Sequence, residues 1–280
     1  MPMHCFDVGT QIIEPDFHYT DVQHESYESL GFCIFDKFLT PEAVRQGRQH
    51  IDRIVAQRAE GFPIGEILAP HQLGEEWLWE ISTHKKVLDL VERQLGPNIV
   101  FWQTTLLTKE PFTGIAVPWH QDQPYWVVSP PVVTLWVTFD DVDSENGTMS
   151  VLPRWHNRGA LPVVKEEGKF FDLSIDLDSL PANADEMAVA YVMKAGQAAI
   201  HNSMIPHLSV PNRSNRWRRV LTIHYSRADA AEMGHRRYED YRNRNPFDRE
   251  YYLVRGENPG GIVGLNPRTN LSRLPREGAD

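Results

Sequence analysis

Trp119-His120-Gln121-Asp122 is the stretch around which the rest of the chain can be interpreted, together with His207 far downstream. His120 and Asp122 are two residues apart, and side chains on a β-strand return to the same face at every second residue. A strand through this stretch directs an imidazole and a carboxylate toward one place. A third ligand from a distant strand completes the two-histidine, one-carboxylate set that binds Fe(II) and leaves coordination positions open.

Strand-like sequence surrounds this stretch. Several runs are rich in β-branched and aromatic residues, and Asn146-Gly147 is a strong hairpin signal between two of them. The predicted strands are residues 30–35, 99–108, 132–140, 149–153, 188–193, 197–202 and 218–225. The last of these places four residues on one face: Arg218, Val220, Thr222 and His224. Helices are predicted over residues 40–60, where Thr40-Pro41-Glu42 forms a start signal, and over 82–95, where Gly96-Pro97 forms a stop.

The third ligand has two candidates in the sequence. His201 and His207 both lie near the end of a predicted strand. Ser209, Asn212 and Arg218 follow His207 at the spacing of the family that the motifs below resemble, and this resemblance favours His207. His156 and His224 are interpreted as polar wall or surface groups, although His224 shares the predicted face of Arg218 and could line the pocket.

These motifs together resemble the phytanoyl-CoA dioxygenase family of iron- and 2-oxoglutarate-dependent oxygenases. The resemblance runs from about Tyr27 to Tyr225. It rests on the joint spacing of His120-Gln121-Asp122, Glu145-Asn146-Gly147, Leu152-Pro153, His207-x-Ser209, Asn212-x-Ser214 and Arg218. The chain departs from many relatives after Pro153, where it has Arg154-Trp155-His156 in place of Gly-Ser-His. This departure puts the local turn and the pocket wall in question, but not the metal ligands.

The resemblance implies a mainly β fold with flanking helices, a double-stranded β-helix or jelly-roll barrel. Periodicity alone indicates only a mixed chain with many strands. We predict a single domain over residues 1–280, with an N-terminal arm (1–26), a solvated insertion (154–187) and a charged C-terminal tail (228–280) that docks on the barrel or on a neighbouring subunit.

The resemblance also implies the roles of the site residues. His120, Asp122 and His207 bind Fe(II), 2-oxoglutarate chelates the metal, and O2 takes the remaining position. Arg218 binds the distal carboxylate of 2-oxoglutarate, with Ser209 as its hydroxyl partner. Further co-substrate contacts are expected from Trp136, Thr105 and Gln103. Two other arginines are less suitable anchors: Arg219 falls on the opposite strand face, and Arg216 precedes the strand.

The implied reaction is oxidation of an unactivated C–H bond, most often hydroxylation, with release of succinate and CO2. Asp122 favours oxygen transfer, because related halogenases replace this carboxylate with a small residue. Tyr125, Trp126 and Gln103 are expected to contact a compact, partly apolar metabolite or natural-product intermediate. The alternatives are a metal-dependent isomerase or hydrolase that needs no 2-oxoglutarate, and a non-catalytic binding module on the same barrel.

Composition limits the partners. The 280 residues include 41% hydrophobic and 24% charged residues, as in ordinary globular proteins, and the net charge of -10 argues against nucleic acid or an anionic membrane as the main partner. No stretch is apolar over the length of a membrane span, and residues 1–7 lack the features of a secretion signal. Cys5 and Cys33 suit a reducing cytoplasm. The oligomeric state has no signal in the sequence.

Overall fold

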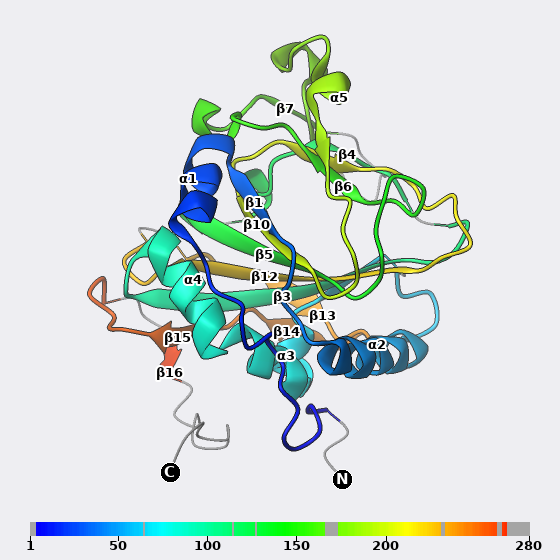
Figure 1. The fold of residues 1–280 in the computed structure, drawn as a ribbon, viewed down its shortest axis with the longest axis vertical. Helices are drawn as coiled ribbons and strands as arrows, with labels where there is room; N and C mark the ends of the chain where they lie inside the picture. Colours follow the sequence, from blue (N-terminus) through cyan, green and yellow to red (C-terminus); the bar gives the residue numbers. More distant parts are fainter. Residues whose placement is uncertain are drawn as a thin grey trace.

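Two largely antiparallel sheets face each other in the computed structural model (Figure 1). The structure describes residues 4–63, 65–113, 115–126, 128–165, 173–230, 233–261 and 265–267. The large sheet has the order β1-β10-β5-β12-β3-β15-β16, with β2 paired to β3. Its strands are β1 (Phe32–Phe35), β2 (Glu66–Leu68), β3 (Ile99–Lys109), β5 (Val132–Thr138), β10 (Ala198–Asn202), β12 (Arg218–Arg227), β15 (Tyr251–Arg255) and β16 (Leu265–Pro267).

The second sheet is small and has the order β4-β11-β6-β9. Its strands are β4 (Val117–His120), β6 (Met149–Val151), β9 (Val189–Ala190) and β11 (His207–Ser209). Two separate ribbons complete the described strands: β7 (Val163–Lys165) with β8 (Leu173–Ile175), and β13 (Arg237–Glu239) with β14 (Pro246–Asp248). Two facing antiparallel sheets with this crossed strand order form the expected jelly-roll.

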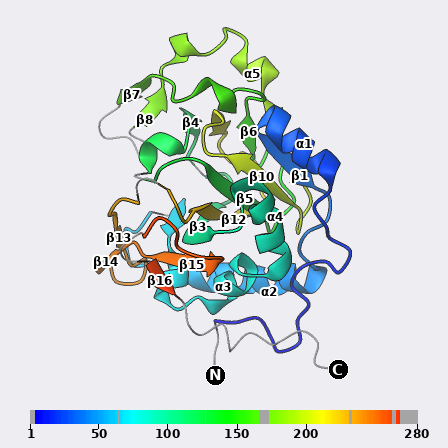
Figure 2. The same ribbon diagram turned by 90° about the vertical axis from the view of Figure 1, so that its left-hand side faces the viewer.

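Helices cover the outer face of the large sheet, below it in Figure 1. They are α2 (Pro41–Ala56), α3 (Glu76–Ser82) and α4 (Lys85–Leu95), with α1 (Asp21–Leu30) beside β1 and the short α5 (Ala184–Met187) at the far end of the small sheet (Figure 2). Short 3-10 turns are η1 (Pro70–Leu73), η2 (Gln123–Tyr125), η3 (His156–Arg158) and η4 (Leu177–Ser179). The predicted helix starting at Thr40 forms but ends at Ala56. The helix predicted over residues 82–95 forms as α4, which begins at Lys85, and α3 precedes it in a segment for which no helix was predicted.

Helix α1 was not predicted, and it corrects two expectations. Thr20 and Gln23 form a reciprocal capping box that starts this helix inside the segment expected to be an arm. Gly31 ends it in the left-handed conformation, with φ 85°. The strand expected from residue 30 therefore begins only at Phe32, because Leu30 and Gly31 close the helix.

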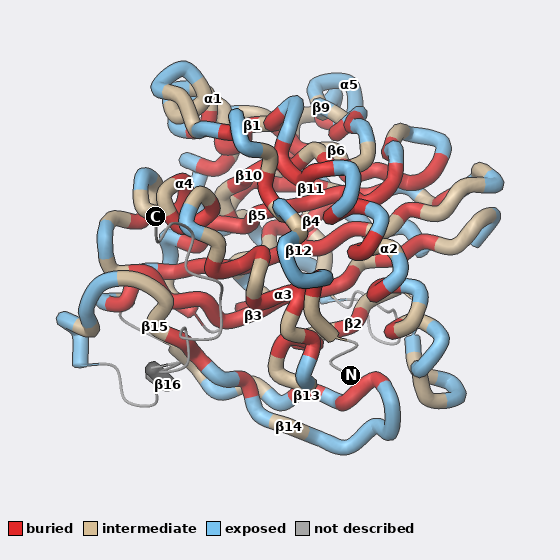
Figure 3. The backbone as a smooth tube through the Cα atoms, turned by 60° about the horizontal axis from the view of Figure 1, so that its bottom comes forward, coloured by how far each residue is buried: buried red, intermediate tan, exposed pale blue. Residues whose placement is uncertain are grey.

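Strand alternation divides the large sheet into a helix-covered face and a cavity-lining face. On β12, Leu221, Ile223 and Tyr225 join the cluster packed under the helices, while Thr222 and His224 face the space between the sheets. Figure 3 shows the consequence: the central strands are buried along their length, while the peripheral ribbons are partly exposed. The alternation predicted for residues 218–225 is thus confirmed.

The N- and C-terminal segments meet at Glu75, whose side chain is fully buried (0% exposed). It forms two hydrogen bonds with Arg53 of α2 and accepts others from Trp77 Nε1 at 3.0 Å and Tyr241 Oη at 3.2 Å. His4 Nδ1 lies 3.3 Å away. One carboxylate therefore connects the chain start, two helices and the C-terminal segment. Within the described ranges, no helix has the length and apolarity of a membrane span.

Candidate metal and co-substrate site

The three expected ligands meet at one point in the small sheet. His120 ends β4 and is the register partner of His207 at the start of β11. Asp122 lies just beyond β4, with helical backbone angles (φ -66°, ψ -35°), because the chain turns at once into η2, which contains Pro124. His120 and Asp122 are therefore not on one strand face, as expected from the spacing; a tight turn brings the carboxylate back.

Ligand atoms of His120, Asp122 and His207 all lie within 4.8 Å of one another. Asp122 Oδ1 is 3.8 Å from His120 Nε2 and 3.7 Å from His207 Nε2. Each ring has its Nδ1 near a backbone carbonyl: Pro118 O at 2.9 Å for His120 and Ile205 O at 3.0 Å for His207. Because a carbonyl only accepts, Nδ1 carries the proton in both rings, and Nε2 is the nitrogen that can bind a metal.

The electrostatics favour metal-binding protonation states. Burial, followed by the neighbouring His207, lowers the pKa of His120 to about 4, and burial also lowers the pKa of His207. Both imidazoles are therefore neutral at pH 7. Burial alone would raise the pKa of Asp122, but the surrounding imidazoles outweigh it and keep this pKa well below its usual range. Two neutral imidazoles and one carboxylate suit a divalent first-row metal.

His201, the competing third ligand, lies on β10 across the cavity. Its Nε2 is 3.7 Å from Asp122 Oδ2, whereas the other two rings approach Oδ1. It is not part of the cluster whose ligand atoms converge. The geometry thus groups His207 with His120 and Asp122 and leaves His201 beside Asp122, where it can orient the carboxylate.

A cavity of about 230 Å³ extends from these ligands between the two sheets. All ten residues that the sequence assigned to the site line it. Tyr125 stands edge-on to His120 with ring centroids 6.0 Å apart, and its hydroxyl donates to Leu173 O. Trp126 packs against Trp102 at 5.1 Å. His224 also lines the cavity, and its Nδ1 forms a hydrogen bond with Thr134 Oγ1 over 3.1 Å.

Gln103 lines the cavity, and residues of the C-terminal segment hold its side chain in place. Its Nε2 donates to Thr105 Oγ1 at 2.9 Å, while its Oε1 accepts from Tyr238 Oη at 2.5 Å and Arg249 Nη2 at 3.3 Å. Arg249 also lies 4.6 Å over the Trp102 ring. The tail after residue 228 therefore docks on the barrel of its own chain and orients a cavity residue, which the sequence left undecided.

One end of the cavity is cationic. Arg218 is 4% exposed, its Nε has no hydrogen-bond partner, and no carboxylate of the described residues lies within ion-pair distance. Lys109, its cross-strand partner in the register of β3 and β12, is equally buried and also lacks a described carboxylate partner. Burial, followed by Arg218, lowers the pKa of Lys109 to about 6. Two buried cations without a protein anion are costly unless a ligand supplies negative charge.

Ser209 is part of the same cationic end. Lys109 Nζ donates to Ser209 Oγ at 2.8 Å. Arg218 lies 5.8 Å over the ring of Trp136, and Thr105 lines the wall between the two strands. A carboxylate is the group that fits here, because guanidinium, ammonium and hydroxyl donors converge. Sequence reasoning missed Lys109, since only the pairing register shows that it neighbours Arg218.

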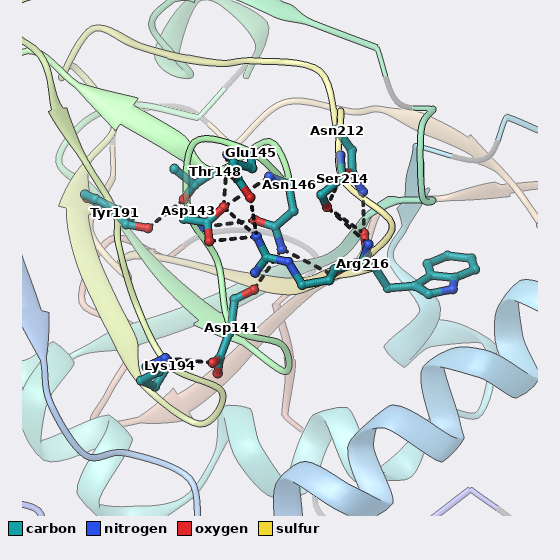
Figure 4. A network of polar contacts seen from close by, with 11 residues as sticks. Asp141, Asp143, Glu145, Asn146, Thr148, Tyr191, Lys194, Asn212, Ser214 and Arg216 are labelled. Atoms are coloured by element: carbon teal, nitrogen blue, oxygen red, sulfur yellow. Dashed lines mark hydrogen bonds and ion pairs between the residues drawn. The ribbon is translucent and has the colours of Figure 1, made fainter.

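The two rival arginines are neutralised elsewhere. Arg216 Nη2 binds Asp143 at 2.8 and 2.9 Å and approaches Glu145 at 3.4 Å (Figure 4). Arg219 binds Asp140 at 3.0 Å and Asp52 at 2.8 Å on the opposite face of β12. Neither lines the cavity.

The remaining motif residues hold together the loops that follow β5 and β11 (Figure 4). Asn146 Nδ2 donates to Asp141 O at 2.7 Å and Trp217 O at 3.2 Å. Gly147 has φ 85°, and a Cβ there would lie 2.7 Å from Val210 O, so only glycine fits. A second amide, Asn212, donates to three backbone carbonyls, those of Lys109, Glu110 and Arg216.

The departure at Arg154-Trp155-His156 remodels a turn and not the cavity. Arg154 adopts φ 70°, and His156 packs so closely on Gly31 that a Cβ there would lie 2.5 Å from its Nδ1. His156 Nε2 lies 3.2 Å from Glu28 O. The turn therefore joins the small sheet to α1.

A jelly-roll that holds two neutral histidines and a carboxylate beside a carboxylate-binding end defines a non-haem iron oxygenase. The chain belongs to the phytanoyl-CoA dioxygenase family, whose model matches residues 27–220. It is an enzyme that depends on iron and 2-oxoglutarate.

Individual relatives agree with this family. The peroxisomal phytanoyl-CoA dioxygenase of Rattus norvegicus is 26% identical over 74% of this chain and 68% of its own. A probable alpha-ketoglutarate-dependent hypophosphite dioxygenase of Stutzerimonas stutzeri is 30% identical over 56% of each chain. The structure of the non-heme monooxygenase ThoJ, in its apo form, has a TM-score of 0.67 and 25% identity over 87% of this chain and 86% of that one.

Proposed function

We propose that the enzyme hydroxylates an unactivated C–H bond of a small metabolite or natural-product intermediate and releases succinate and CO2. The observation that carries this proposal is the convergence of His120, Asp122 and His207 in a cavity whose other end contains the unpaired cation Arg218. Such a pair of subsites matches a metal chelator with a distal carboxylate.

His120, Asp122 and His207 are the proposed iron ligands, and Asp122 leaves no room for a halide at its position. When bound, Fe(II) and 2-oxoglutarate activate O2, so that one oxygen atom enters the substrate and the other enters succinate. The carbonyls of Pro118 and Ile205 keep each ring's Nε2 directed at the metal.

Arg218, Lys109 and Ser209 are proposed to bind the distal carboxylate of 2-oxoglutarate. A charge-assisted hydrogen bond is worth roughly 1.5–3 kcal/mol, more than a neutral one. Trp136 and Thr105 form the walls of this subsite and restrict the chelator to one orientation.

Tyr125, Trp126 and Gln103 are proposed to contact the substrate on the other side of the metal. The two aromatic rings exclude water from the reacting carbon, and the amide of Gln103 offers a hydrogen bond that Tyr238 and Arg249 hold in place. The cytoplasmic location expected from Cys5 and Cys33 stays a prediction.

The proposal is tested under anaerobic conditions with Fe(II) and 2-oxoglutarate. We expect the weak visible charge-transfer band of the chelated complex with the wild-type protein, its loss in His207→Ala, and a strong decrease in Arg218→Ala. Arg216→Ala is the matched control, because this arginine is paired with acids outside the cavity. Iron binding without a band would contradict the oxygenase proposal and favour the isomerase, hydrolase or binding-module alternatives, which are indifferent to Arg218.

A further inference from the structure

Two charged side chains line the cavity without a role in metal or co-substrate binding. The charged residues of the described wall are Glu66, Lys109, Asp122, Arg218 and Arg236. Asp122 belongs to the metal cluster, and Lys109 and Arg218 form the cationic end. Glu66 and Arg236 remain, one of each sign.

Glu66 enters the cavity from an edge strand. It pairs with Leu107 in the register of β2 and β3, and both residues line the cavity. Its carboxyl group makes no hydrogen bond or ion pair with any residue in the described ranges. Burial raises the pKa of Glu66 to about 7, although Arg236 opposes this shift. A carboxyl group in this state lacks a nearby cation that fully compensates its burial.

Arg236 enters the same cavity from the C-terminal segment. Its Nη1 donates to Tyr125 O at 3.2 Å, three residues after the ligand Asp122. Its own backbone carbonyl accepts from Arg249 N at 2.8 Å, and its guanidinium lies 5.8 Å over the Tyr238 ring. The arginine is therefore held near the metal by the docked tail. No carboxylate of the described residues lies within ion-pair distance of it.

The charges of the loaded site leave these two groups uncompensated. At the metal and the cationic end, the positive charges of Fe(II), Arg218 and Lys109 face the two carboxylates of 2-oxoglutarate and that of Asp122, so neither Glu66 nor Arg236 gains a charged partner from the co-substrate. A substrate with a single charge would pair with one of the remaining groups and leave the other partly buried without a partner of opposite charge. A molecule with an ammonium and an oxyanion satisfies both and adds no net charge.

We propose that Glu66 and Arg236 form the polar subsite for the primary substrate and select a small zwitterion, with its ammonium group at Glu66 and its carboxylate or phosphonate at Arg236. This inference rests on the proposed function, because it assigns the substrate class of the same cavity. Arg236 offers a planar fork of donors that suits an oxyanion, and Tyr125, which also lines the cavity, accepts the apolar part of the ligand.

The test uses the full chain loaded anaerobically with Fe(II) and 2-oxoglutarate. The probes are a panel of L-amino acids, ω-amino acids and aminoalkylphosphonates, and binding is measured by the change in the charge-transfer band and by calorimetry. Each probe is compared with its N-acetyl form, which lacks the cation, and with its amide or ester, which lacks the anion. We expect at least one zwitterion to bind, and both blocked forms to bind at least tenfold more weakly.

Variants separate the two contacts. Glu66→Gln should remove the preference for the free ammonium group, and Arg236→Met should remove the preference for the free oxyanion, while both keep the charge-transfer band of the wild type. Arg237→Met is the matched control, because this exposed neighbour does not line the cavity. The unchanged band shows that each variant is folded.

The outcomes distinguish this inference from the proposed function. Absence of the band in the wild-type protein overturns the oxygenase proposal itself. A normal band without binding of any zwitterion, or equal binding of the blocked forms, overturns the zwitterion inference and leaves the oxygenase proposal intact. Unchanged selectivity in both variants excludes Glu66 and Arg236 as the subsite.

Discussion

At the scale of single residues, the sharpest prediction concerns Lys109. Lys109→Met removes one of two cations at the distal carboxylate, so we expect the affinity for 2-oxoglutarate at pH 6 to fall about tenfold to a hundredfold. Calorimetry with the anaerobic Fe(II) protein measures this change. Thr113→Val, an exposed position past the end of β3, is the control. An unchanged affinity would show that Lys109 only supports the loop at Ser209 and Val210.

The lowered pKa of Lys109 also leads us to expect that co-substrate binding depends on pH. Its pKa is about 6 in the free protein, and a bound carboxylate raises this pKa, so binding takes up a proton. The affinity for 2-oxoglutarate should therefore be flat below pH 6 and decrease above it, by at most tenfold per pH unit, until the pKa of the complex is reached. The same titration with Lys109→Met should lack this slope. A slope that persists in the variant assigns the proton to another group.

At the scale of elements, the loop that follows β11 depends on Asn212. Asn212→Ala leaves the carbonyls of Lys109, Glu110 and Arg216 without their shared donor, which should cost roughly 1–3 kcal/mol of unfolding free energy. The affinity for 2-oxoglutarate should fall as well, because both Lys109 and the approach to Arg218 lose their support. Urea denaturation and calorimetry measure the two effects. Asn215→Ala, exposed in the same loop, should change neither quantity.

Elements also show which parts of the fold and site the sequence could predict. The alternation of polar and apolar residues correctly predicted the strand that presents Thr222 and His224, because this pattern depends only on residues that are neighbours in the sequence. The motif spacing brought His120, Asp122 and His207 together, although a turn and not a strand positions Asp122. Lys109 could not be found in this way, because its role depends on the register between β3 and β12. Helix α1 was missed because its capping box lies in a polar stretch with a weak apolar pattern.

At the scale of the whole molecule, Glu75 connects segments from both ends of the chain. Glu75→Gln breaks a buried ion pair with Arg53 and should lower the unfolding free energy by about 3–5 kcal/mol. Burial raises the pKa of Glu75, but Arg53, His4 and Trp77 together lower it by more. The net decrease means that this contribution is present above the unfolded pKa and is lost as the pH falls through the folded pKa. Denaturation at pH 7 and pH 4 checks both statements. Glu60→Gln, on an exposed turn, should leave the stability unchanged at both pH values.

The C-terminal segment after residue 228, which docks on the barrel, affects how enzymes of this kind can diverge. The family model ends at residue 220, yet Arg236, Tyr238 and Arg249 all come from beyond it and approach the cavity from outside the shared barrel. The part of the chain that the family model matches contains the candidate metal ligands and Arg218, whereas part of the proposed substrate surface comes from residues beyond that match. Changes in this C-terminal segment can therefore alter the proposed substrate contacts and leave the candidate iron ligands unchanged.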